Sequence, residues 1–236
     1  GHDINYLELA GVSGHSGRQD GGPPPLGIQI ADVAGGSLHA VIGILAAVVE
    51  RQRSGLGQYI DISMTDCVAS LNSMAASASL AGQTPQAPEQ GMLNGASFYD
   101  YYETKDGRYF SVGSLEPQFM AGLAAALELP LLLAKGTSFD PEDRQAVKQA
   151  LQEKFKSQDF VVWQQLFKTL DICVEPVLSL DEALVSPIAE QRGWVVDVPL
   201  SENSEQTEAQ LACPIKFSRS QIKYAFIGQG LGEGKW

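Results

Sequence analysis

Cysteine is scarce in this sequence, and its spacing excludes several kinds of site. The 236 residues include three cysteines, Cys67, Cys173 and Cys213, and no two of them form a CxxC pair. This spacing predicts neither a disulfide framework nor a zinc knuckle. A reducing compartment suits so few and scattered cysteines, and we therefore expect a cytoplasmic protein.

Basic residues are also few. The chain has 16 Lys and Arg against 28 Asp and Glu, a formal net charge of −12. Broad contact with nucleic acid or an anionic membrane needs a basic surface, so we expect neither partner, although a local site can still take an anionic ligand. The longest apolar run, residues 40–49, is shorter than the ~20 residues of a membrane-spanning helix.

Apolar residues make up 44% of the chain and charged residues 19%, a balance that favours a folded core. Residues 38–53 are apolar on nearly all sides and precede Gly55 and Gly57, which predicts a buried helix. Residues 26–31 predict a buried extended segment or the start of a helix. The alternation in residues 58–63 predicts a strand, and the small side chains of residues 64–80 predict a helix.

The Pro-containing polar stretch at residues 82–91 predicts a linker, and hence two structural units. Residues 98–103 and 109–112 flank Asp106-Gly107 and predict a hairpin. Three helical patterns follow, at residues 117–127, 141–156 and 160–170, two of them with Pro in the first turn. Beyond them we expect a strand at residues 173–178, a loop at 199–210 and a last extended piece at 212–218.

The densest group of polar side chains lies in residues 1–6, Gly-His-Asp-Ile-Asn-Tyr. His2 is the side chain suited to carry a proton near neutral pH, and Asp3 or Asn5 could hold its tautomer. The competing interpretation is an ordinary polar loop. Together with His15 and His39, His2 shows no metal-ligand spacing, so we expect no metal site.

Two carboxylates elsewhere each admit a structural and a functional interpretation. Asp32 precedes Gly35 and Gly36, so it either caps a helix or works beside free backbone N–H groups that hold an oxyanion. In the second case the glycines would let a ligand approach the backbone. Glu116 precedes Pro117, and it either caps a helix or faces a cleft, where it would pair with an imidazolium.

Four motifs in one order identify a family that no single motif would. They are GHDINY at residues 1–6, ADVAGG at 31–36, ERQRSGLGQYID at 50–61 and LEPQF at 115–119. Together they closely resemble the family III CoA-transferases (CaiB/BaiF). The second and third motifs are shared by the whole family, whereas HDINY and EPQF point to its α-methylacyl-CoA racemases.

The resemblance implies a reaction and a role for each motif. It implies exchange of the α-proton of a 2-methylacyl-CoA thioester, with His2 serving one face of the α-carbon and Asp32 the other. Glu116 would orient and charge-balance His2, and backbone N–H groups around Asp32 would receive the enolate oxygen. No metal or redox cofactor is implied, since coenzyme A enters with the substrate. The residues implied to line the thioester and pantetheine end are Gly1, Asp3, Ile4, Asn5 and Tyr6.

The same resemblance implies an α/β fold with a partial Rossmann-like large domain and a small α+β domain. We expect residues 1–85 to belong to the large domain, residues 86–198 to the small domain and residues 199–236 to a segment that returns to the large domain. Family members carry a long stretch before the HDINY motif, so the chain resembles an N-terminally truncated piece. An interlocked homodimer is implied, with Glu116 approaching His2 of the partner.

Two alternatives stay open. In a CoA-transferase, the aspartate at position 32 would be a nucleophile that forms an acyl anhydride and then a thioester, and His2 and Glu116 would have no evident task. The other alternative is of another class, an inactive fragment that folds or dimerises without catalysis.

Overall fold

The computed structural model describes residues 1–228, and the chain divides into two compact units at residues 1–176 and 177–236. This division does not coincide with the expected domain limits at 85/86 and 198/199, which stay a prediction. The last eight residues of the expected return segment, 229–236, lie outside the described residues.

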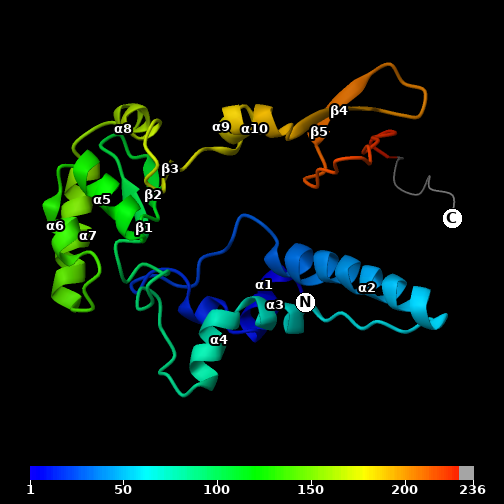
Figure 1. The fold of residues 1–236 in the computed structure, drawn as a ribbon, viewed down its shortest axis with the longest axis horizontal. Coiled ribbons are helices and arrows are strands. Elements are labelled where there is room, and N and C mark those ends of the chain that lie inside the picture. The colour runs from blue at the N-terminus through cyan, green and yellow to red at the C-terminus, as the bar shows by residue number, and fades with distance from the viewer. Residues whose placement is uncertain (229–236) are drawn as a thin grey trace. The chain divides into compact units, whose positions relative to one another are not determined.

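The first unit begins with helices, coloured blue to cyan in Figure 1. A small buried cluster of Leu7, Ala31 and Val68 holds three of them together. Proline and glycine are concentrated in the irregular segment between the second and third helices, residues 16–29, which we call the strap. The helices, in chain order, are α1 (Asp3–Leu9), the 3₁₀ turn η1 (Ser13–His15), the π-helix η2 (Ile30–Leu38), α2 (His39–Ser54), α3 (Met64–Leu71) and α4 (Ser73–Leu80).

Helix α2 forms where the apolar pattern predicts it and ends at Gly55, which takes the left-handed conformation at φ 76°. The expectation that it is buried is wrong for this chain, because none of its residues is buried and Ile42 is 61% exposed. Together η2 and α2 form one helical segment, Ile30–Ser54, of 25 residues and mean hydropathy 1.8. By length and composition alone this segment could cross a membrane. The sequence patterns did not indicate this, because the longest uninterrupted apolar run, at residues 40–49, is shorter.

A neighbouring expectation is also wrong, because residues 58–63 form no strand and Tyr59 is 91% exposed. For residues 26–31, the second of the two alternatives is confirmed, since helix η2 starts at Ile30. Leu26 and Ile28 in the strap are exposed, so they form no buried extended segment. Ile60 and Ile62 lie beside Gly43 of α2 but have no strand to pair with, whereas Ile30 and Ala31 join the small buried cluster.

The expected hairpin is confirmed as β1 (Asp100–Glu103) and β2 (Tyr109–Val112), which pair antiparallel with Tyr101 opposite Ser111. Gly107 in the turn has φ 79°, a conformation that favours glycine. The strand expected at residues 173–178 is confirmed as β3 (Val174–Pro176), which completes an antiparallel sheet of order β1-β2-β3. Both sheets in the described residues are antiparallel.

Helices cover this sheet and close the larger core of the unit (Figure 1). The three expected helices are confirmed, and a further short helix lies between the first two. An aromatic cluster joins them to the sheet, with the Phe110 and Phe160 ring centroids 4.8 Å apart. Trp163 and Phe167 stack at 5.6 Å. The helices are α5 (Pro117–Ala126), α6 (Pro130–Lys135), α7 (Pro141–Phe155) and α8 (Phe160–Phe167).

The second unit holds two short helices and a two-stranded antiparallel sheet. Val195 pairs with Leu211 and Pro199 with Thr207. The loop expected at residues 199–210 is therefore partly wrong, because its first residue and its last four belong to strands. Residues 212–218 form no strand. The elements are α9 (Leu180–Leu184), α10 (Pro187–Arg192), β4 (Val195–Pro199) and β5 (Thr207–Leu211).

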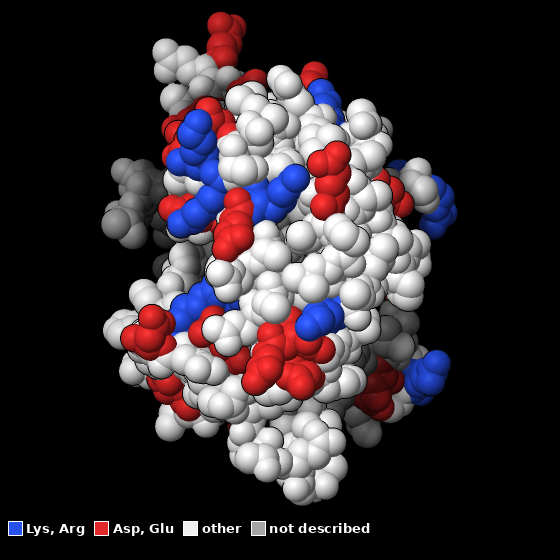
Figure 2. Space-filling model, turned by 90° about the vertical axis from the view of Figure 1, so that its left-hand side faces the viewer, with Lys and Arg blue, Asp and Glu red and all other residues white. Residues whose placement is uncertain are grey.

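Charged side chains of both signs lie next to one another on the face drawn in Figure 2. Lys and Arg form no broad basic patch on that face. The absence of a nucleic-acid partner stays a prediction.

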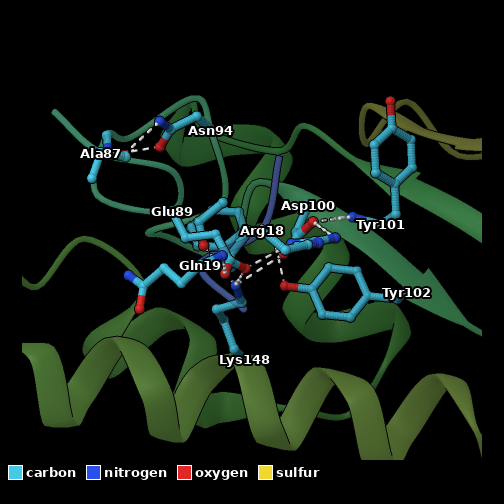
Figure 3. A network of polar contacts seen from close by, with 12 residues as sticks. Arg18, Gln19, Ala87, Glu89, Asn94, Asp100, Tyr101, Tyr102 and Lys148 are labelled. Carbon is cyan, nitrogen blue, oxygen red and sulfur yellow. Dashed lines mark hydrogen bonds and ion pairs between the residues drawn. The ribbon is translucent and has the colours of Figure 1, made fainter. Parts of the chain in front are cut away.

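A cluster of four charged side chains ties the strap to the α+β part of the first unit (Figure 3). Arg18 makes a two-pronged contact with Asp100, at 2.8 and 2.7 Å, and a further one with Glu89 at 2.9 Å. Lys148 projects from α7 to the other side of the cluster, 2.9 Å from Asp100 and 3.7 Å from Glu89.

Each carboxylate in the cluster is stabilised in its ionised form. Burial by itself would raise the pKa of Asp100, but hydrogen bonds from Arg18 and Lys148 outweigh it and hold that pKa below its usual value. Burial opposes ionisation of Glu89 as well, and hydrogen bonds from the Gln19 backbone and Arg18 lower its pKa.

We expect Asp100→Asn to lower the free energy of unfolding at pH 7 by about 1–3 kcal/mol, because two cations lose a nearly buried partner. Since the folded pKa of Asp100 lies below the unfolded value of about 3.9, its stabilisation is present above that pH and is lost as the pH falls through the folded value. The difference between variant and parent should therefore shrink below about pH 4. Urea unfolding at several pH values measures it.

Asp20→Asn is the matched control, since Asp20 is an exposed carboxylate in the same strap. If both variants had the same stability as the parent at pH 7, the cluster would not stabilise the fold.

Candidate active site

A cavity of about 360 Å³ in the first unit is lined by His2 from the start of α1 and Asp32 from the start of η2. These are the two residues expected to act on opposite faces of one carbon atom. The two residues thus line one cavity although 30 positions separate them in the chain. Asp3 and Ile4 line the same cavity.

The start of α1 holds the backbone of His2 in place. The His2 N–H donates to Asn5 Oδ1 at 2.9 Å, and the Asn5 N–H donates to the His2 carbonyl oxygen at 2.8 Å. This reciprocal pair satisfies backbone groups that a helix start leaves open. Asn5 therefore has a structural task here and does not line the cavity, so its expected contact with substrate stays a prediction.

The start of η2 is held by Asp3. Its Oδ1 accepts hydrogen bonds from the Ala31 N–H at 2.5 Å and from the Asp32 N–H at 3.0 Å. The expectation that free N–H groups around Asp32 receive an enolate oxygen is therefore wrong for these two amides, because a carboxylate of the chain itself already occupies them.

The glycines after Asp32 serve packing between helices. Gly35 is buried, and a Cβ atom added to it would lie 3.2 Å from the Met64 carbonyl oxygen and 3.2 Å from Val68 Cγ2. Gly36 likewise faces the Met64 side chain. Both contacts are with α3, so Gly35 and Gly36 allow η2 to approach α3 closely, which is a different use from the ligand approach expected of them.

The remaining residues of the first motif differ in exposure. Ile4 is half exposed beside the cavity. Tyr6 packs against the small cluster of Leu7, Ala31 and Val68, and its ring lies about 3 Å from the place of a Cβ atom on Gly1. Gly1 and Tyr6 do not line the cavity, and their roles toward substrate stay predictions.

Glu116 lies elsewhere in the same unit, as the residue before α5, and it does not line the cavity with His2. Two hydrogen bonds hold the residues just before Glu116 in place. The Gly113 N–H donates to the Cys173 carbonyl oxygen at 2.9 Å, and the buried Ser114 hydroxyl donates to the Ile172 carbonyl oxygen. Desolvation by neighbouring atoms, and then the Glu116 carboxylate, raise the pKa of the Cys173 thiol, although the residue is exposed. Within one chain Glu116 and His2 are thus not brought to one cavity.

One wall of the cavity comes from the strap, of which sequence patterns predicted only residues 26–31, as a buried extended segment or the start of a helix. Its lining residues there are Pro24, Pro25, Leu26, Ile28 and Gln29. Ser16 and Pro24 also border a second, open cavity of about 690 Å³ against the β1-β2-β3 sheet. The one signal that could have found this wall is its uncommon content of apolar residues for an exposed loop.

A family model described as "CoA-transferase family III" matches residues 1–227. The chain belongs to CoA-transferase family III. This membership confirms the family that the four motifs indicated.

Several curated relatives are similar to this member of the family. It is 42% identical over 189 residues to the α-methylacyl-CoA racemase of Mus musculus and 38% identical over 198 residues to that of Homo sapiens. These matches cover 78% and 82% of this chain but 48% and 50% of the relatives, so the chain spans about half their length. A succinyl-CoA:mesaconate CoA-transferase of Haloarcula marismortui is 36% identical over 135 residues, 56% of this chain and 33% of that protein.

Solved structures share the fold. A CAIB/BAIF family protein from Brucella suis superposes with a TM-score of 0.75 at 23% identity, covering 99% of this chain and 60% of that one. A protein from Mycobacterium tuberculosis gives a TM-score of 0.73 at 18% identity, covering 96% and 58%. The chain thus has the mixed helix and strand fold of CaiB/BaiF structures.

The other two histidines of this family member have local structural partners. His15 Nε2 lies 3.0 Å from Asn72 Oδ1, and His39 Nδ1 lies 2.6 Å from the Ala34 carbonyl oxygen. The described residues hold no group of three or more His, Cys, Asp or Glu that could bind a metal ion.

We expect Gly35→Ala to destabilise the protein by about 1–3 kcal/mol, because the added methyl group presses on the backbone of α3 and on buried Val68. The gain in helix propensity from Gly to Ala, about 1 kcal/mol, acts in the opposite direction. A net loss of stability would therefore show that the packing cost exceeds this gain. Thermal unfolding measures the change. Gly27→Ala is the control, since no described heavy atom lies within 4 Å of its added Cβ; equal midpoints for the two variants would contradict the packing role.

Proposed function

We propose that this chain is part of an α-methylacyl-CoA racemase-like enzyme that interconverts 2-methylacyl-CoA epimers by proton transfer through an enolate. The observation that carries the proposal is the shared cavity of His2 and Asp32 in a chain 42% identical to a racemase. A planar enolate has two faces, so scrambling its configuration needs a proton carrier on each.

In this mechanism neutral His2 takes the α-proton from one face of the thioester, and the C–H electron pair moves into the enolate. Protonated Asp32 then donates its proton to the α-carbon from the opposite face. The reverse direction begins with ionised Asp32 as the base and the His2 imidazolium as the acid. Each proton carrier typically contributes about 10²–10⁴-fold in rate.

The enolate oxygen needs a hydrogen-bond donor other than the Ala31 and Asp32 amides, since Asp3 occupies both. Coenzyme A is part of the substrate in this proposal, and the chemistry requires no metal or redox group. The residues proposed to lie near the thioester and pantetheine end of the substrate are Gly1, Asp3, Ile4, Asn5 and Tyr6. We also propose a cytoplasmic location for the protein.

Glu116 is proposed to act in an interlocked homodimer, where it would approach His2 of the partner and balance the imidazolium charge. Two observations support this. Glu116 does not share the His2 cavity within one chain, and helix α2 leaves an apolar surface exposed that a second body would cover. A Rossmann-like large domain, of which residues 1–85 would form part, is proposed as one of the two domains that meet at this site.

Removing one base should damage exchange from one face more than from the other. In the complete protein we expect His2→Ala to slow deuterium wash-in from one enantiomer of a 2-methylacyl-CoA by about 10²-fold or more. Asp32→Ala should slow it from the other. Mass spectrometry of the recovered thioester measures both rates.

Equal losses from both enantiomers in each variant would argue against the two-base arrangement. A second experiment tests CoA transfer, the activity named for the CoA-transferase relative. If the chain is racemase-like, incubation with an acyl-CoA followed by borohydride or hydroxylamine should leave Asp32 unlabelled. A covalent label on Asp32 would replace the racemase proposal with CoA transfer, and an unlabelled protein without exchange would favour an inactive fragment.

Co-expression of two inactive variants tests the dimer. If Glu116 serves the partner's His2, a mixed dimer of His2→Ala and Glu116→Ala chains contains one intact site. Random pairing makes half the dimers mixed, so about a quarter of parental activity should return. Each variant expressed alone is the control. Activity no higher than the average of the two single variants, or a monomer by light scattering, would contradict the shared site.

A further inference from the structure

The Asp3 carboxylate connects the starts of two helices. Asp3 is the first residue of α1, and its Oδ1 accepts from the N–H groups of Ala31 and Asp32 in the first turn of η2. One oxygen atom thus satisfies two amides that the start of a helix leaves without an intrahelical partner.

Water is a poor substitute for this oxygen. Ala31 is fully buried at 0% exposure, so its N–H would lose a hydrogen bond without gaining solvent if the carboxylate were removed. An unsatisfied buried amide costs enough free energy to shift the first turn of η2. The backbone at the start of η2 is therefore held in place by a side chain that comes from α1.

The two residues this bond relates are the proposed proton carriers. His2 directly precedes Asp3, and Asp32 is itself one of the two donors. Among the described residues, the hydrogen bonds that join α1 to η2 are those made by Asp3. The two helices also meet in the small apolar cluster of Leu7, Ala31 and Val68, and such apolar contacts are less directional than a pair of hydrogen bonds.

Building on the proposed function, we infer that Asp3 is a positioning residue, whose carboxylate sets the distance and orientation between His2 and Asp32 across the cavity. This role differs from the substrate contact expected of Asp3. This role also gives a reason for the acidic residue directly after His2. Along the chain, the path from His2 to Asp32 runs through the whole strap, whereas the Asp3 side chain links the two helix starts directly.

The kinetic test compares Asp3→Ala and Asp3→Asn in the complete protein, with Glu8→Ala as the matched control. Glu8 is an exposed residue on the same helix, and its carboxylate makes no hydrogen bond or ion pair in the described residues. A displacement of about 1 Å can cost about 10²-fold in rate. We therefore expect Asp3→Ala to lower kcat by about 10–100-fold from both enantiomers, with KM changed by less than about threefold.

Asp3→Asn should recover part of that rate, because its amide oxygen can still accept from both N–H groups without the charge. A raised KM with kcat intact would overturn the inference in favour of substrate binding. A loss confined to one enantiomer, or one that merely follows the fraction of unfolded protein, would overturn it as well.

Hydrogen–deuterium exchange of the same proteins tests the bond without any activity. In Asp3→Ala we expect the amides in residues 29–34 to exchange about tenfold faster, because a helix start that loses its charge-assisted bonds opens more often. Peptides from α7 should keep the parental rate. Unchanged exchange would overturn the inference. A parent without α-proton exchange would instead refute the proposed function, and faster amide exchange in Asp3→Ala would then still show that Asp3 holds η2.

Discussion

The ion-pair cluster around Asp100 is the contact on which the arrangement of the first unit depends. Arg18 lies in a strap without helix or strand, and its two-pronged bond reaches a side chain 82 positions away that is 8% exposed. A partly buried carboxylate with two cationic partners strongly disfavours any arrangement that separates them. Because the strap forms one wall of the cavity, this distant contact also limits how far that wall can move from His2 and Asp32.

The candidate site lies on a surface that the chain by itself leaves open. None of the residues of α2 is buried, although the helix is strongly apolar, and η2 with Asp32 continues directly into it. A soluble protein rarely exposes so much contiguous apolar surface without a partner for it.

Local rules account for the elements that sequence patterns predicted correctly. Proline in the first turn marks α5 and α7, and Asp106-Gly107 marks the turn between β1 and β2, because each acts through its own backbone geometry. The strand expected at residues 58–63 failed for the opposite reason: an alternating pattern needs a neighbouring strand to pair with, and the described residues offer none there. The prediction that α2 is buried failed because an apolar sequence does not by itself provide the neighbouring residues that would bury the helix.

The sequence by itself determined the family, through four motifs in order, and it singled out His2, Asp32 and Glu116. The tertiary structure alone decided that His2 and Asp32 share a cavity, that Glu116 does not reach it within one chain, and that Asp3 occupies the amides beside Asp32. The physical reason is separation along the chain. Motifs and helix signals act over a few residues, whereas the bonds of Asp3 and Arg18 join positions 28 to 82 residues apart, and no local pattern specifies which donor meets which carboxylate.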